Sequence, residues 1–191
     1  MNPAAILDAL DALAPLGELP RTGWVVRGCH PPESIAAHTL AVAQLVAMVC
    51  DALAADGVVV DGGRAVRMAL FHDAAEARTG EVPMPIKAAG LADALHRAEA
   101  AIVDQMLPAP TAAAWRAAEQ ADDVEARVVR ACDKLQMLAT AWRYQRRGVE
   151  AAAFDGMWNR AENLRALELP VMRALYRTLY MRAGRVPPVE L

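Results

Sequence analysis

The sequence predicts an all-α fold. Alanine is abundant, apolar residues recur at helical spacing, and aromatic residues make up only 5% of the chain. Alanine has the highest helix propensity, whereas sheets draw on aromatic and β-branched residues. A chain of 191 residues fits one domain. Residues 1–191 contain no repeat, low-complexity linker or second-domain boundary, so we expect a single helical domain.

The pattern of apolar residues, caps and breakers places the individual helices. Ser34 and Asp61 stand at N-cap positions, and Gly80 is a typical helix stop. Prolines and glycines indicate structured loops or short turns at 14–32 and 79–87. We therefore expect helices over residues 3–13, 35–55, 64–78, 91–106, 112–119, 122–147 and 151–182, the last broken near Gly156.

Charge and cysteine content exclude several classes of protein. The net charge of −3 gives no broad basic surface, so a nucleic-acid duplex is not an expected partner. Three widely spaced cysteines predict reduced thiols and a cytoplasmic protein. The N-terminus carries acidic residues, unlike a signal peptide. The most apolar stretch, 35–50, is shorter than a membrane span and contains His38, which predicts a buried helix and no membrane association.

A His72-Asp73 doublet near the end of the expected helix 64–78 is the first candidate for chemistry. Adjacent helical side chains point about 100° apart, so both reach one ion only if it lies over the helix edge. Glu76 would lie between them, where a carboxylate contacts a metal-coordinated water. By itself the doublet is more often a capped helix end with a hydrogen-bonded histidine.

Two further polar residues interrupt apolar helices. His38 lies one turn inside the expected helix 35–55, and neutral imidazole is the commonest metal ligand. Asp133 lies in the middle of an apolar helix, where a buried carboxylate needs a partner. That partner is either a basic residue such as Arg130 or a metal ion. Two histidines and two aspartates suit a divalent ion that still binds water.

Three blocks of sequence resemble the HD-domain phosphohydrolase superfamily, and more closely its 5′-deoxynucleotidase-like branch. They are RTGWVVRGCHPPESIAAHT, ALFHDAAEARTGEVPMPIK and EARVVRACDKLQML, which span residues 21–138. The resemblance implies a helical bundle with a mononuclear metal site, on which helices 151–182 pack. It also implies hydrolysis of deoxynucleoside 5′-monophosphates to deoxynucleoside and phosphate, and a homodimer.

The resemblance assigns roles to individual residues. Glu76 matches the acid that orients or deprotonates the attacking water, and Glu81 matches an acid beside the sugar and scissile phosphate. Trp24 matches a tryptophan that packs on the deoxyribose, and Glu125 matches an acid with a structural role. The metal ligands correspond to His38, His72, Asp73 and Asp133, with Mn²⁺, Co²⁺, Fe²⁺, Zn²⁺ and Mg²⁺ all compatible with that donor set.

Two positions depart from a bacterial branch of the family, which has Arg before the tryptophan and Glu before the first ligand histidine. This chain has Gly23 and Ala37 there. Phosphate recognition then falls to another cation, with Met84 lining the same pocket. The candidate cations are Arg27, Lys87 and Arg78.

Three other functions stay open from the sequence. A deoxynucleoside triphosphate hydrolase would share the metal ligands. A two-metal oxygenase or cyclic-dinucleotide hydrolase needs more histidines between the doublet and Asp133, where only His96 occurs. A non-catalytic scaffold or nucleotide sensor would not need Glu76 and Glu81. We expect an enzyme acting on a small nucleotide.

Overall fold

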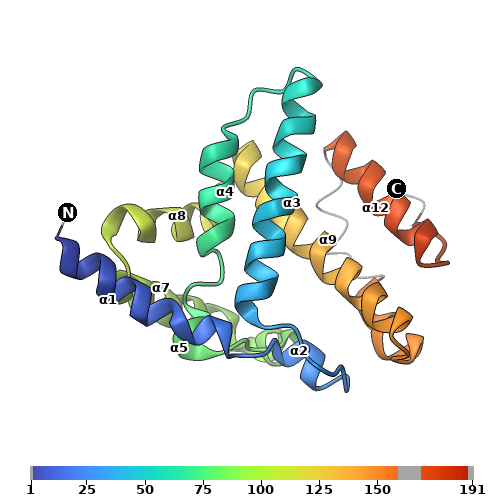
Figure 1. The fold of residues 1–191 in the computed structure, drawn as a ribbon, viewed down its shortest axis with the longest axis horizontal. Coiled ribbons are helices and arrows are strands. Elements are labelled where there is room, and N and C mark those ends of the chain that lie inside the picture. Colours follow the sequence, from blue (N-terminus) through green and yellow to red (C-terminus); the bar gives the residue numbers. More distant parts are fainter. Residues whose placement is uncertain (1, 159–168, 189–191) are drawn as a thin grey trace. The chain divides into compact units, whose positions relative to one another are not determined.

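The computed structural model describes residues 2–158 and 169–188. Apart from one isolated bridge between Pro20 and Ser34, these residues form helices and no strand (Figure 1). The all-α prediction is confirmed. Contacts divide the chain into two compact units, one of residues 1–40 and 67–121 and the other of residues 41–66 and 122–191.

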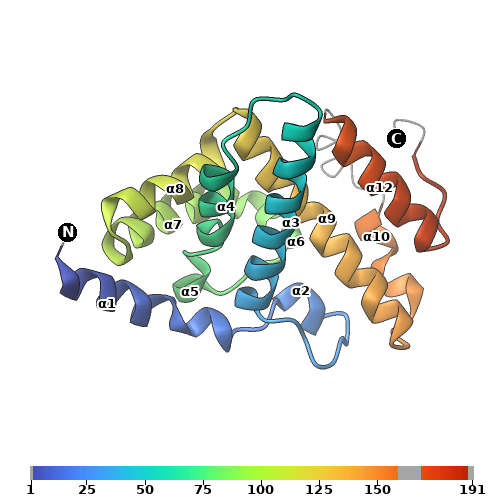
Figure 2. The same cartoon turned by 45° about the horizontal axis from the view of Figure 1, so that its top comes forward.

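The first unit packs helices around small and aromatic side chains. α7 and α8 lie against each other, and α1 packs on α7 (Figure 2). Their core contains Val103, Leu107 and Trp115 together with Ala74 and Ala75. The elements that lie wholly in this unit are α1 (Pro3–Leu13), η1 (Ala14–Gly17), α2 (Thr22–Val25), α5 (Glu76–Thr79), α6 (Met84–Ile86), η2 (Lys87–Leu91), α7 (Ala92–Met106) and α8 (Ala109–Gln120).

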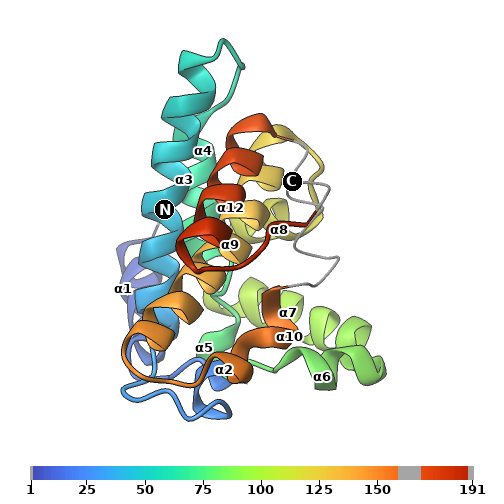
Figure 3. The same cartoon turned by 90° about the vertical axis from the view of Figure 1, so that its right-hand side faces the viewer.

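The second unit is built on a long helix, α9 (Val124–Arg146), against which α12 (Pro170–Arg182) packs (Figure 3). The Tyr176 hydroxyl donates a hydrogen bond of 3.2 Å to the Ala131 carbonyl and so joins these two helices. Between them the described residues include a 3₁₀ turn, Ala151–Phe154, and the short α10, Asp155–Trp158.

Two helices, α3 (Ile35–Ala55) and α4 (Gly62–Phe71), have residues in both units, and both begin at their expected caps. The Ala37 amide donates to Ser34 Oγ at 3.2 Å, and the Arg64 amide donates to Asp61 Oδ1 at 2.9 Å. Among the described helices, α3 alone is long and apolar enough to cross a membrane. This is weak evidence, because core helices of globular proteins meet the same criteria.

The expectation of one helix over 64–78 is wrong. α4 ends at Phe71, residues 72–75 form turns, and α5 begins at Glu76. His72 causes the break, because its Nδ1 bonds the Ala69 carbonyl at 2.7 Å, which a continuing helix would pair with the amide of Asp73. The chain then continues with three-residue turns, in which the Glu76 amide donates to the Asp73 carbonyl at 3.0 Å.

Other boundaries differ less. The expected loop 79–87 contains the short α6, and α8 begins at Ala109 rather than 112. The last expected helix, 151–182, is not continuous in the described residues, because α12 begins afresh at Pro170, a residue favoured at the first helical position. Residues 159–168 lie outside the described residues.

Candidate metal centre

The turn after α4 presents the side chains of His72 and Asp73 together. His72 Nε2 lies 3.2 Å from Asp73 Oδ2, and His38 Nε2 lies 3.6 Å from the same oxygen. Two atoms that each lie about 2.1 Å from one ion are about 3.0–3.4 Å apart for octahedral or tetrahedral coordination. The distance from His72 to Asp73 lies in this range and that from His38 to Asp73 is slightly longer. The turn explains how the adjacent residues His72 and Asp73 reach a common point.

The backbone fixes which nitrogen of His72 faces this point. A carbonyl oxygen only accepts hydrogen bonds, so the Nδ1 of His72, 2.7 Å from the Ala69 carbonyl, carries the proton. In the neutral ring, Nε2 then holds the lone pair that a metal requires. His38 is completely buried on the first turn of α3, and its ring centroid lies 5.5 Å from that of His72.

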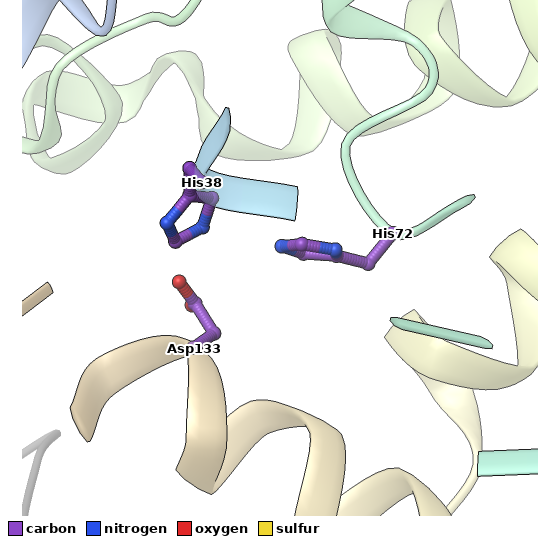
Figure 4. A group of neighbouring side chains, drawn as sticks. All are labelled: His38, His72 and Asp133. Carbon is purple, nitrogen blue, oxygen red and sulfur yellow. The ribbon is translucent and has the colours of Figure 1, made fainter. Parts of the chain in front are cut away.

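Asp133 from α9 completes a His/His/Asp group that could hold a metal ion. One ligand atom each from His38, His72 and Asp133 lie within 4.8 Å of one another (Figure 4). Asp133 Oδ2 accepts a bond of 2.9 Å from Lys134 Nζ, while Arg130 lies 3.8 Å from Asp122. The alternative in which Arg130 pairs with Asp133 stays a prediction.

The carboxyl groups of Asp73 and Glu76 are held in opposite states. Burial by itself would raise the pKa of Asp73, but the charges of His72 and His38 and a hydrogen bond from His72 hold it well below its usual range. Burial and the negative charge of Asp73 raise the pKa of Glu76 to about 9, against the positive charge of Arg21. Asp73 is thus an anion suited to a cation, and Glu76 holds its proton strongly.

Trp24 lies in the short helix α2 and anchors it to the protein. Its ring is 2% exposed, and its indole N–H donates to Glu33 Oε2 at 3.1 Å. The Arg21 amide donates to the Glu33 carbonyl at 2.9 Å. Glu33 therefore fixes this segment through two hydrogen bonds, one from the backbone and one from the indole. A sugar-facing role for the ring stays a prediction.

Glu81 contacts the N-terminal end of α2. Its Oε1 accepts bonds from Arg21 Nε at 2.8 Å and Arg21 Nη2 at 2.7 Å. Its Oε2 accepts from the Gly23 amide at 2.9 Å, and its carbonyl accepts from the Thr22 hydroxyl at 2.9 Å. Both carboxylate oxygens are therefore engaged with protein groups.

The remaining predicted residues are placed differently. Arg27 folds back so that Nη1 donates to the Gly23 carbonyl at 2.7 Å. Lys87 is half-buried, and its positive charge opposes the rise in the pKa of Glu76. Met84 is 38% exposed on α6. Arg78 is exposed and lines a cavity of about 550 Å³ with Asp8, Ala12, Ile102, Gln105 and Met106, none of which is a predicted site residue.

Sequence reasoning missed Arg21 and Glu33 as site-building residues. Both stand inside the first quoted block, RTGWVVRGCHPPESIAAHT, so the signal was present. The partners of these two residues could not be read from the sequence. Arg21 bonds Glu81, which lies 60 positions away, and Glu33 accepts a hydrogen bond from the ring nitrogen of Trp24.

Known proteins share both the sequence and the fold of this chain. The HD domain profile matches residues 14–168. Mouse 5′-deoxynucleotidase HDDC2 is 31% identical over 148 residues, which cover 74% of this chain and 71% of the mouse protein. The human protein of the same name is 30% identical over 147 residues, covering 74% of this chain and 69% of the human protein.

Solved structures agree. A conserved hypothetical protein from Pyrococcus furiosus superposes with a TM-score of 0.81 at 27% identity, covering 92% of this chain and 99% of that one. A Pyrococcus horikoshii protein gives a TM-score of 0.75 at 29% identity, covering 90% of this chain and 98% of that one. The chain therefore belongs to the HD domain family and, within it, to the 5′-deoxynucleotidase-like branch.

Proposed function

We propose that this chain is a metal-dependent 5′-deoxynucleotidase that hydrolyses deoxynucleoside 5′-monophosphates to deoxynucleoside and phosphate. The observation that carries the proposal is the convergence of two imidazoles with the Asp73 carboxylate at 3.2 and 3.6 Å, one turn before a buried glutamate. The mouse and human relatives, whose names state this activity, support the choice of substrate.

The metal ligands in this proposal are His38, His72, Asp73 and Asp133. The donor set fits a divalent ion, because two neutral nitrogens and two carboxylates leave a dication near neutral overall and leave coordination positions for water. Imidazole and carboxylate groups bind a metal ion in their deprotonated forms, so metal binding would release any proton that these side chains carry.

A bound divalent ion polarises a phosphoryl oxygen and lowers the pKa of coordinated water from 15.7 towards about 7. The positive charge of a bound ion would lower the pKa of Glu76, and the ionised carboxylate would then take the proton of the attacking water. Its 8% exposure and raised pKa make its carboxylate a stronger base than a surface glutamate, and general bases contribute about 10²–10⁴-fold. The positive charges of Arg21 and Lys87 both act on Glu76, where an anionic phosphate would need them.

The ligand types also bear on which divalent ion the centre binds. Imidazole favours first-row transition metals, whereas Mg²⁺ prefers oxygen ligands and retains its waters. The two histidines therefore favour Mn²⁺, Co²⁺, Fe²⁺ or Zn²⁺ over Mg²⁺.

The organisation of the chain follows from the same family assignment. The match over residues 14–168 includes residues of both compact units and supports one HD domain. The small-molecule substrate, reduced buried cysteines and absence of a broad basic surface fit a cytoplasmic enzyme that binds no duplex and no membrane. We also propose that the enzyme forms a homodimer.

Phosphate release from all deoxyribonucleoside and ribonucleoside mono- and triphosphates, with each of five divalent ions, tests the function. We expect deoxyribonucleoside monophosphates to be the best substrates and inorganic phosphate the product. Release of triphosphate from deoxynucleoside triphosphates would instead indicate a triphosphohydrolase. Metal binding without hydrolysis of any nucleotide would refute the proposed activity.

A further inference from the structure

The Arg21–Glu81 pair joins two segments that lie 60 residues apart in the chain. On one side is segment 21–24, which consists of Arg21, the N-cap of α2, and the first three residues of that helix, including Trp24. On the other is the segment that follows α5, a few residues after the His72-Asp73 doublet and Glu76. Four bonds of 2.7–2.9 Å cross between them, three to the Glu81 carboxylate and one to its carbonyl.

The two charged side chains are largely withdrawn from solvent, with 13% of Arg21 and 12% of Glu81 exposed. Hydrogen bonds between charged groups are stronger than neutral ones, and losing one partner of a partly buried pair leaves the other charge uncompensated. Either substitution should therefore release the same contact between the two segments.

Gly23 fits this arrangement. A Cβ at this position would meet Arg27 Nη1 at 3.6 Å and Glu81 Oε2 at 3.7 Å. An added Cβ would therefore be in van der Waals contact with both side chains. Because residue 23 is a glycine, the Glu81 carboxylate can bond Arg21 and the amide of residue 23 without a side chain beside it.

We propose that Glu81 is a positioning residue, which acts on hydrolysis by fixing Arg21 and the start of α2 beside the metal centre rather than by contacting the nucleotide. The inference rests on the proposed function for its kinetic consequence. Glu81 bonds both the Arg21 guanidinium and the Gly23 amide, so it fixes the cation and the backbone next to Trp24 together. Without Glu81, Arg21 and the start of α2 would lose this fixed position.

A double-mutant cycle separates positioning from direct contact. Glu81→Gln, Arg21→Gln and the double variant are compared with Glu18→Gln, an exposed glutamate three residues before Arg21. We expect each single substitution in the pair to lower kcat/KM of the best nucleotide by about 10–100-fold, mostly through KM, with metal content unchanged. The double variant should be no worse than the more damaged single variant. Effects that multiply in the double variant would show that Glu81 acts independently of Arg21 and would overturn the proposal.

Hydrogen exchange tests the same contact without activity. Amides 21–24 should exchange faster in Glu81→Gln and in Arg21→Gln, to a similar extent, and as in the wild type in Glu18→Gln. Unchanged exchange in Glu81→Gln would overturn the proposal even if the wild type is a deoxynucleotidase. A wild type that hydrolyses no nucleotide would refute the proposed function instead, and faster exchange would still support the positioning contact.

Discussion

Glu76 and Glu125 are both 8% exposed, yet their surroundings differ. The Glu125 carboxylate accepts the Asp61 amide at 2.7 Å and Arg64 Nη1 at 3.2 Å. Glu76 instead faces the negative charges of Asp73 and Glu81, which raise its pKa together with burial. The depth of burial is equal, so the partners decide which acid is structural and which is suited to chemistry.

The neighbours of Glu125 extend the contrast. Arg64 also donates to Asp123 at 2.7 Å, and Asp123 and Asp61 cap the first turns of α9 and α4. Every charge in this cluster meets an opposite charge or a backbone amide of a helix start. In the metal centre, acids and imidazoles converge instead. Acids that are paired with cations or helix amides stabilise helices, whereas converging acids and imidazoles are suited to binding a cation.

Removing a ligand should give the largest effect. His72→Ala or Asp73→Ala should abolish both metal binding and hydrolysis, because each removes one atom of the 3.2 Å contact between two proposed ligands. Metal analysis of the purified variants and phosphate release measure this. His96→Ala is the control and should keep its metal. Full metal content in Asp73→Ala would contradict the assignment.

Glu76→Gln should retain metal and lower kcat by about 10²–10⁴-fold, because an amide cannot accept the proton. Glu125→Gln should change kcat at most a few-fold. Turnover numbers at saturating metal separate the two glutamates. A Glu76→Gln enzyme with wild-type turnover would end the distinction between them.

The same two substitutions should change the stability of the metal-free protein in opposite directions. Because the pKa of Glu76 rises on folding from 4.5 to about 9, its stabilising effect is complete below pH 4.5 and is lost as pH increases towards 9. At pH 7.5 we expect Glu76→Gln to raise the free energy of unfolding by about 1–4 kcal/mol. The gain should shrink to nothing near pH 4.

Glu125→Gln should lower the free energy of unfolding by about 1–2 kcal/mol, because Arg64 loses a charged partner. Urea denaturation of chelator-treated protein between pH 4 and pH 8 measures both variants. Destabilisation by Glu76→Gln at pH 7.5 would show that Glu76 has a compensating partner.

Substitution of Trp24 in α2 should have the smallest effect on kinetics. Trp24→Ala should reduce the preference for dAMP over AMP by about 10-fold, since the fixed indole would no longer restrict the sugar pocket. The ratio of kcat/KM for the two substrates measures it. Trp142→Ala, on α9 and outside the predicted site residues, is the matched control. An unchanged ratio in Trp24→Ala would assign the ring to loop packing alone.

Much of the fold was predictable because it depends on local patterns. Helical periodicity and the caps Ser34 and Asp61 are visible in the sequence, and His38 and Asp133 stand out as polar residues in apolar helices. The break at His72 was not predictable from periodicity, because a ring nitrogen takes a backbone carbonyl. The Arg21–Glu81 pair escaped because each residue, read singly, resembles an ordinary surface charge.

The most direct test of the central claim is a crystal structure grown with Mn²⁺, with the ion located by anomalous scattering. We expect one peak, with a nitrogen of His38, a nitrogen of His72 and oxygens of Asp73 and Asp133 about 2.0–2.3 Å away. A peak elsewhere, or a structure in which Asp133 stays paired with Lys134 away from both imidazoles, would contradict the assignment.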